Sequence, residues 1–236
     1  MTCSGAGGTT TLQSVVVSVT PSSSGLIASY SFGEGSGTQV VDRSGNLRNG
    51  AVVGNPAWVA GKHGLGISLG STSNINLGNT LPVKGLKAYT LSGWMKRTAT
   101  GSVIMMGKET PTSGDSLEIT EWSDGYVYFG VGTASTFTGG KFFINNSSWH
   151  NFTLVFDGTK TGNANRLKGY VDGVAVTLSF LGSIPSVTSS GSTPFGIGSL
   201  GGYYSNGIID DVRMYNRVLS STEVVTDMNT AVLGGQ

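Results

Sequence analysis

Two distant segments carry side-chain oxygens that could bind a hard cation. Asp42 and Asn46 lie in the glycine-containing segment 42–50 (DRSGNLRNG), and Asp210 and Asp211 lie in the apolar segment 207–215 (GIIDDVRMY). Calcium in proteins is bound by carboxylate, amide and backbone carbonyl oxygens. A loop of this kind can fold such oxygens around one ion. The four residues therefore predict a structural calcium site.

In segment 207–215, the position of Asp210 indicates that its carboxylate needs a partner. In an extended strand alternate residues share a face, which places Asp210 with the apolar side chains of Ile208, Val212 and Met214. A carboxylate buried there without a partner would be very costly. The alternative to calcium is that Asp210 accepts backbone N–H donors or pairs with an arginine, and that Asp42 begins an Asx turn. The arginines considered are Arg43, Arg213 and Arg217.

The acidic residues that come nearest to a catalytic pair are Glu118 and Glu121, in segment 117–124 (LEITEWSD). A spacing of three on a strand directs the two side chains to opposite faces. Carboxylates that act together must flank one bond at about 5–9.5 Å. His63 and His150 lie in separate segments without a nucleophile pattern. We therefore expect no catalytic site.

Aromatic residues in polar loops indicate sugar binding. Trp122 and Tyr126 flank a Ser-Asp-Gly turn, and Tyr203, Tyr204 and Asn206 lie in the glycine-rich segment 199–206. Aromatic faces stack on sugar rings, and nearby polar groups orient the hydroxyls. The alternative is that these side chains shield an edge of the fold or contact a partner subunit.

The composition limits the partners. Charged residues make up 11% of the 236 residues, against a typical share of about 25%. The net charge of +1 comes without a cluster of Lys and Arg, so no nucleic-acid surface is expected. No segment approaches the roughly 20 apolar residues of a membrane span. Cys3 is the only cysteine, which excludes an intrachain disulfide.

The elements that would position these residues are mostly strands. Short apolar runs alternate with turn signals from Leu26 onward, and the chain contains 38 glycines. Phe152, Leu154 and Phe156 share one strand face, and Asp172-Gly173 predicts a hairpin turn. Only residues 220–230 are expected to be helical, with Ser220 or Ser221 as the N-cap.

Residues 1–24 stand apart from the body at residues 25–236. The β-branched run 9–20 (TTTLQSVVVSVT) is followed by the hinge Pro21-Ser-Ser-Ser-Gly25. We expect an extended arm that adds a strand to a neighbouring subunit, with folding back onto its own body as the alternative. Met1 is either the start of a protein made in the cytoplasm, as phage virion proteins are, or part of a piece of a secreted precursor.

Several motifs in order resemble laminin-G-like modules of the concanavalin A-like lectin and glucanase superfamily. They lie at residues 25–37, 41–50, 58–64, 91–96, 148–158, 169–173 and 207–225. The resemblance implies an all-β jelly-roll sandwich of two antiparallel sheets with a short C-terminal helix. It also implies a calcium ion near the two end motifs, contacted by a loop Asp, loop carbonyls and an Asp of the closing strand.

The resemblance leaves three classes of function open. The first expectation is a non-catalytic carbohydrate-binding module, lectin-like or adhesin-like, located outside the cell or on its surface. The second is a structural virion protein, such as a capsid decoration or tail-fibre component, assembled through residues 1–24 on the virion surface. The third is a polysaccharide lyase or glycoside hydrolase, although the E-x-D-x-x-E arrangement of the glucanases is missing from segment 117–124.

Overall fold

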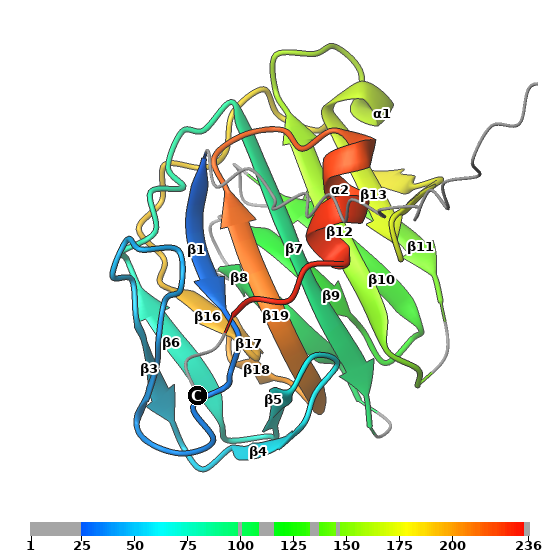
Figure 1. Ribbon diagram of the computed structural model, residues 1–236. Helices are drawn as coiled ribbons and strands as arrows, with labels where there is room; N and C mark the ends of the chain where they lie inside the picture. The colour runs from blue at the N-terminus through cyan, green and yellow to red at the C-terminus, as the bar shows by residue number, and fades with distance from the viewer. Residues whose placement is uncertain (1–24, 99–100, 109–115, 133–136, 145–146, 234–236) are drawn as a thin grey trace, which may run out of the picture.

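A computed structural model describes residues 25–98, 101–108, 116–132, 137–144 and 147–233. The predicted arm at residues 1–24 lies outside this part of the chain. The described residues form two packed antiparallel sheets, shown one behind the other in Figure 1. The prediction of an all-β jelly-roll sandwich is confirmed.

The sheet nearer the viewer in Figure 1, here called the front sheet, follows the order β14-β13-β12-β7-β19-β5-β4, and β1 also pairs with β19. Its strands among the described residues are β1 (Leu26–Tyr30), β4 (Ala57–Ala60), β5 (Leu65–Leu69), β7 (Ala88–Arg97), β12 (His150–Asp157), β13 (Leu167–Val171), β14 (Val174–Val176) and β19 (Gly207–Tyr215).

The other sheet, here called the back sheet, follows the order β15-β11-β10-β9-β8-β16-β6-β3-β2. Its strands in the described part of the chain are β2 (Gln39–Val40), β3 (Gly50–Val53), β6 (Asn74–Gly78), β8 (Val103–Lys108), β9 (Leu117–Glu121), β10 (Tyr126–Val131), β11 (Gly139–Phe143), β15 (Ser179–Leu181) and β16 (Phe195–Ile197). A separate small hairpin joins β17 (Ser199–Leu200) to β18 (Tyr203–Tyr204).

The core lies between the two sheets and follows strand alternation. Phe152, Leu154 and Phe156 of β12 all enter it, as their spacing predicts. From the back sheet, Ile119 and Phe129 enter the same cluster. Neighbouring residues on these strands therefore face outward, and this alternation decides which side chains can meet a ligand.

Local turn and capping predictions are confirmed. Asp172 and Gly173 both have positive φ (+50° and +77°) and connect β13 to β14, as a primed hairpin turn requires. The C-terminal helix α2 (Ser221–Met228) begins after Ser220, whose side chain accepts a hydrogen bond from the Glu223 N–H. A one-turn helix, α1 (Asn163–Arg166), was not expected from the sequence.

The helix α2 lies over part of the outer face of the front sheet (Figure 1). Val224 of the helix and Leu219 before it pack with Val155, Tyr170 and Tyr215 of the sheet in a second apolar cluster. This cluster fixes the helix across β12, β13 and β19.

The face assigned to Asp210 from alternation is wrong. The pairing of β19 with β7 shifts register between Asp210 and Arg213, and Asp211 has φ +47°. Such a bulge adds one residue and reverses the alternation beyond it. Ile209 and Val212 both enter the core, so Asp210 faces away from it. Asp tolerates this left-handed conformation better than most residues.

Candidate functional site

An aromatic cluster lies on the outer face of the back sheet. Trp122 follows β9, and Tyr203 belongs to the hairpin β17–β18. Their rings meet edge to face, with centroids 5.1 Å apart and planes at 89°. Tyr203 is 56% exposed, so much of this pair faces solvent.

A shallow hollow of about 430 Å³ lies beside this pair. Among the described residues it is lined by Glu118, Trp122, Tyr128 and Phe137. Glu118 and Tyr128 alternate with the core residues Ile119 and Phe129, which is why both face outward. The hollow therefore combines aromatic rings with one carboxylate and one phenol.

Next to the hollow, Tyr126 and Lys141 extend the surface onto β10 and β11. The Lys141 ammonium lies 4.2 Å from the Tyr126 ring centroid and donates to the Tyr128 hydroxyl at 3.3 Å. That hydroxyl in turn donates to Asp124 at 3.2 Å. The hydrogen bond to Tyr128 raises the pKa of Lys141, so its charge is retained at neutral pH. These contacts fix the orientation of the Tyr128 hydroxyl.

The structure brings together only part of the predicted aromatic set. Trp122 and Tyr203 are in contact, and Tyr126 lies on the adjoining outer row of β10. Tyr204 follows Tyr203 on a strand and so points to the other side of the hairpin. Asn206 lies by the β7–β8 connection, where its N–H donates to the Ser102 carbonyl.

The sequence did not indicate that Glu118, Tyr128 and Phe137 line one hollow or that Lys141 lies beside it. For Tyr128 the signal was present, because it alternates with the apolar residues of β10. Sequence analysis also missed the hairpin that presents Tyr203. Gly201 and Gly202 form its turn, both with positive φ (+54° and +90°).

The predicted calcium residues of the first segment form a hydrogen-bonded loop. Asp42 is buried, and its carboxylate accepts the Ser29 and Ser44 N–H groups, both at 2.9 Å, and the Arg48 N–H at 3.0 Å. The Asn46 amide donates to backbone carbonyls of β1. This is the Asx-turn arrangement considered as the alternative to a metal.

Asp210 and Asp211 are held by a different part of the chain. Asp210 Oδ2 accepts the N–H groups of Lys62 and His63, both at 2.8 Å. Burial raises the pKa of Asp210 to about 7, against the effect of these hydrogen bonds. Asp211 Oδ2 lies 2.8 Å from His63 Nδ1, and its Oδ1 accepts the Val232 N–H. Asp210 therefore caps backbone amides, as in the alternative to calcium.

The carboxylates of Asp42 and Asp210 therefore accept hydrogen bonds from N–H and O–H groups of the chain itself. Within the described ranges, no group of three or more His, Cys, Asp and Glu side chains could hold a metal. Calcium binding by Asp42, Asn46, Asp210 and Asp211 stays a prediction.

Glu118 and Glu121 face opposite sides of β9, as their spacing predicts. Glu121 lies opposite the core residues Val103 and Val127 and forms an ion pair with Arg97 at 3.2 Å. Burial raises the pKa of Glu121. Glu118 lines the hollow on the other side. The two carboxylates therefore do not share one site.

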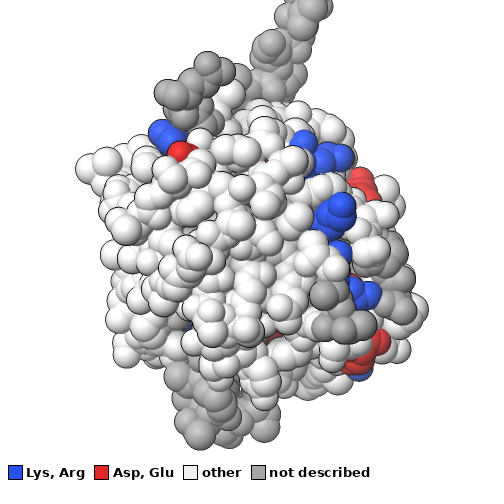
Figure 2. All heavy atoms as spheres, turned by 90° about the horizontal axis from the view of Figure 1, so that it is seen from below, with Lys and Arg blue, Asp and Glu red and all other residues white. Residues whose placement is uncertain are grey.

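One end of the sandwich carries little charge. The end of the sandwich seen in Figure 2 is mostly uncharged, with Lys, Arg, Asp and Glu towards its margins. In the described part of the chain, no helix has the length and apolar character to cross a membrane.

Two packed antiparallel sheets with an aromatic outer surface define a lectin-type sandwich. A laminin-G family model, described as the concanavalin A-like lectin/glucanases superfamily, matches residues 69–225. Because this match covers more than half of the chain, the chain belongs to that family. No curated protein matches the chain significantly.

Solved structures share the fold at low sequence identity. Domain 4 of AbnA, an extracellular GH43 arabinanase from Geobacillus stearothermophilus in complex with arabinotriose, is 19% identical with a TM-score of 0.59. The match covers 86% of this chain and 98% of that domain.

The binding domain of botulinum neurotoxin DC in complex with SialylT is 12% identical with a TM-score of 0.65. The match covers 88% of this chain and 52% of that one, so this chain spans about half of the neurotoxin domain. A structure concerned with the interaction of botulinum neurotoxin type C with two ganglioside molecules is 14% identical, with a TM-score of 0.62 over 87% of this chain and 51% of that one. At these low identities, the structural likeness establishes the fold alone.

Proposed function

We propose that this protein is a non-catalytic carbohydrate-binding module that acts outside the cell or on its surface. The observation that carries the proposal is the Trp122–Tyr203 pair beside the hollow on the back sheet. An open aromatic pair next to oriented polar groups is the arrangement that sugar rings and hydroxyls require.

The chemistry of the hollow supports a sugar as ligand. The rings of Trp122, Tyr128 and Phe137 offer apolar faces for the C–H groups of a pyranose or furanose. The Tyr128 hydroxyl and the Lys141 ammonium that donates to it can exchange hydrogen bonds with sugar hydroxyls. The hollow is open and shallow, which suits a glycan chain lying across the sheet.

The structural neighbours add support of a coarser kind. The arabinanase domain was solved with arabinotriose and a neurotoxin binding domain with SialylT, so proteins of this fold bind glycans. Their low identity leaves the particular sugar to be determined by experiment.

A non-catalytic role is supported by the acidic residues. Glu118 and Glu121 are the nearest approach to a carboxylate pair, and they lie on opposite faces of β9. Glu121 is also held by Arg97. Hydrolysis of a glycosidic bond would need both groups at one bond.

A glycan array followed by calorimetry tests the proposal, with arabino-oligosaccharides and sialylated glycans among the ligands. Trp122→Ala should weaken binding about tenfold or more, a loss of about 1.4 kcal/mol, with an unchanged melting temperature. Tyr204→Ala, a tyrosine of the same hairpin on its other side, is the matched control and should bind as the native protein does. Absence of glycan binding by the native protein would overturn the proposal, as would release of shortened products.

A further inference from the structure

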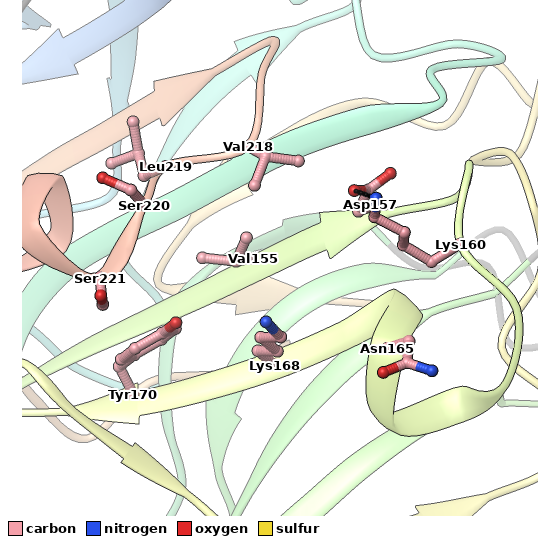
Figure 3. Close-up of a pocket in the computed structure, with 10 residues that line it drawn as sticks. All are labelled: Val155, Asp157, Lys160, Asn165, Lys168, Tyr170, Val218, Leu219, Ser220 and Ser221. Carbon is pink, nitrogen blue, oxygen red and sulfur yellow. Dashed lines mark ion pairs between the residues drawn. The ribbon is translucent and has the colours of Figure 1, made fainter.

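A second pocket lies on the outer face of the front sheet, whereas the aromatic cluster lies on the back sheet. The pocket has a volume of about 190 Å³ and lies between β12, β13, α1 and the start of α2 (Figure 3). Val155 and Leu219 form its apolar floor, continuous with the cluster that fixes α2. Its rim is polar, with Lys160, Lys168 and Asp157 among its residues.

Positive charge exceeds negative charge in this pocket. Lys168 projects from β13 on the same side as Tyr170 (Figure 3), and it has no ion-pair partner among the described residues. Lys160 lies 4.0 Å from Asp157 and its side chain is 61% exposed, so that ion pair is weak. Asp157 Oδ1 is also engaged, because it accepts the N–H and hydroxyl of Thr159.

Tyr170 supplies a neutral donor. The residue is only 6% exposed, lines the pocket, and its hydroxyl has no hydrogen-bond partner in the described part of the chain. Burial raises the pKa of Tyr170, which keeps the hydroxyl protonated. The hydroxyl is not among the buried polar atoms, so it reaches the open space of the pocket, where it can donate to a ligand.

The start of α2 does not oppose an anion. The N-terminus of a helix carries partial positive charge. The nearby Glu223 carboxylate is already compensated, because it accepts the Ser220 N–H at 2.8 Å and pairs with Arg217 at 2.7 Å. Ser220 and Ser221 line the pocket beside these groups.

We propose that this pocket binds an anionic oxygen group, a carboxylate, sulfate or phosphate, carried by a sugar. Lys168 and Lys160 provide the charge, and the Tyr170 hydroxyl donates to an anionic oxygen. The floor of Val155 and Leu219 receives the carbon face of the ring. The volume of the pocket is below the roughly 300 Å³ of an ordinary ligand pocket. The pocket therefore suits a single acidic sugar unit and not an oligosaccharide.

This site is independent of the aromatic site, because the two lie on different sheets. Chemical-shift titration of the labelled protein with sodium sulfate, phosphate, glucuronate and glucose tests it at constant ionic strength. Glucuronate, sulfate and phosphate should shift the amide signals of residues around Lys168 and Tyr170, and glucose should not. Tighter binding of glucuronate than of sulfate or phosphate would show that the ring contributes; equal binding would identify the free anion as the ligand.

Variants locate the site. Lys168→Gln should weaken glucuronate binding about tenfold, as expected for loss of one hydrogen bond to a charged group, and Tyr170→Phe should weaken it by less. Lys84→Gln removes an exposed lysine elsewhere and is the matched control. Trp122→Ala should leave anion binding unchanged while weakening glycan binding at the aromatic site. Binding that survives Lys168→Gln together with Lys160→Gln, or no binding of any of the anions, would overturn the proposal.

Discussion

The outer faces of the two sheets differ in what covers them. On the front sheet, α2 and the residues after it lie against β19, and Arg213 and Tyr215 of that strand find a polar partner in the helix. Arg213 pairs with Asp227 at 3.6 Å, and the Tyr215 hydroxyl donates to Asp227 at 2.5 Å. On the back sheet, Trp122 and Tyr203 meet at a surface open to solvent.

The difference separates stability from recognition. Polar groups buried under α2 contribute to folding only while every partner is present, since an uncompensated buried charge is costly. Aromatic side chains exposed on the back sheet contribute less to folding and are available to a ligand. Substitutions under α2 should therefore lower the melting temperature and leave glycan affinity unchanged. Substitutions of the exposed aromatic residues should lower glycan affinity and leave the melting temperature unchanged.

The largest effect is expected from Asp227→Ala on the front sheet. The variant leaves Arg213, which is 4% exposed, without its buried counter-ion, and should lower the free energy of unfolding by about 3–5 kcal/mol. Denaturant titration measures this loss. Asp124→Ala, which removes an exposed carboxylate from the back sheet, should cost less than about 1 kcal/mol. Equal losses in the two variants would contradict the distinction between the faces.

Chelation tests whether a metal adds to the stability of the front sheet. If Asp42, Asn46 and the aspartates of β19 bind calcium, free ion at a hundredfold its dissociation constant adds about 2.7 kcal/mol. EDTA should then lower the melting temperature, and Asp42→Ala should remove that sensitivity. An unchanged melting curve in excess EDTA would show that hydrogen bonds alone hold these carboxylates.

A double-mutant cycle tests whether Trp122 and Tyr203 act as one surface. Each change to Ala should reduce glycan affinity by about 1.4 kcal/mol, and the double variant should lose less than the sum. The expected coupling is about 1 kcal/mol, within the range for an edge-to-face aromatic pair. Additive losses measured by calorimetry would place the two rings at separate sites.

The smallest effect is expected at the start of α2. Ser220→Ala removes the helix cap and should cost about 1 kcal/mol, whereas Ser221→Ala should cost little. Hydrogen bonds from Ser220 lower the pKa of Glu223, so Glu223 stabilises the fold only while ionised. This contribution is complete above the ordinary Glu pKa of about 4.5 and is lost as the pH falls through the lower folded value. A Glu223→Gln variant should show a weaker loss of stability on acidification.

Features that depend on residues close together in the sequence were predicted correctly, and a feature that depends on distant strands was not. The core face of β12, the turn at Asp172-Gly173 and the cap at Ser220 were predicted because each depends on residues a few positions apart. The predicted face of Asp210 was wrong because the strand bulges at Asp211, where β19 pairs with β7. The Lys62 and His63 amides, which come from another part of the chain, hold Asp210 in this position. Alternation within one strand contains no information about either partner.

By itself, the sequence determined the amphipathic strands and the short closing helix, because local spacing sets which face of a strand or helix is apolar. The jelly-roll class followed from the resemblance of its ordered motifs to laminin-G-like modules. Only the tertiary structure decided which outward-facing residues meet. Trp122 and Tyr203 become neighbours through the position of the β17–β18 hairpin. Lys168 shares a pocket with Leu219 and Ser220 because the start of α2 lies beside β12 and β13. Such contacts depend on strand order and register, which join residues far apart in the chain.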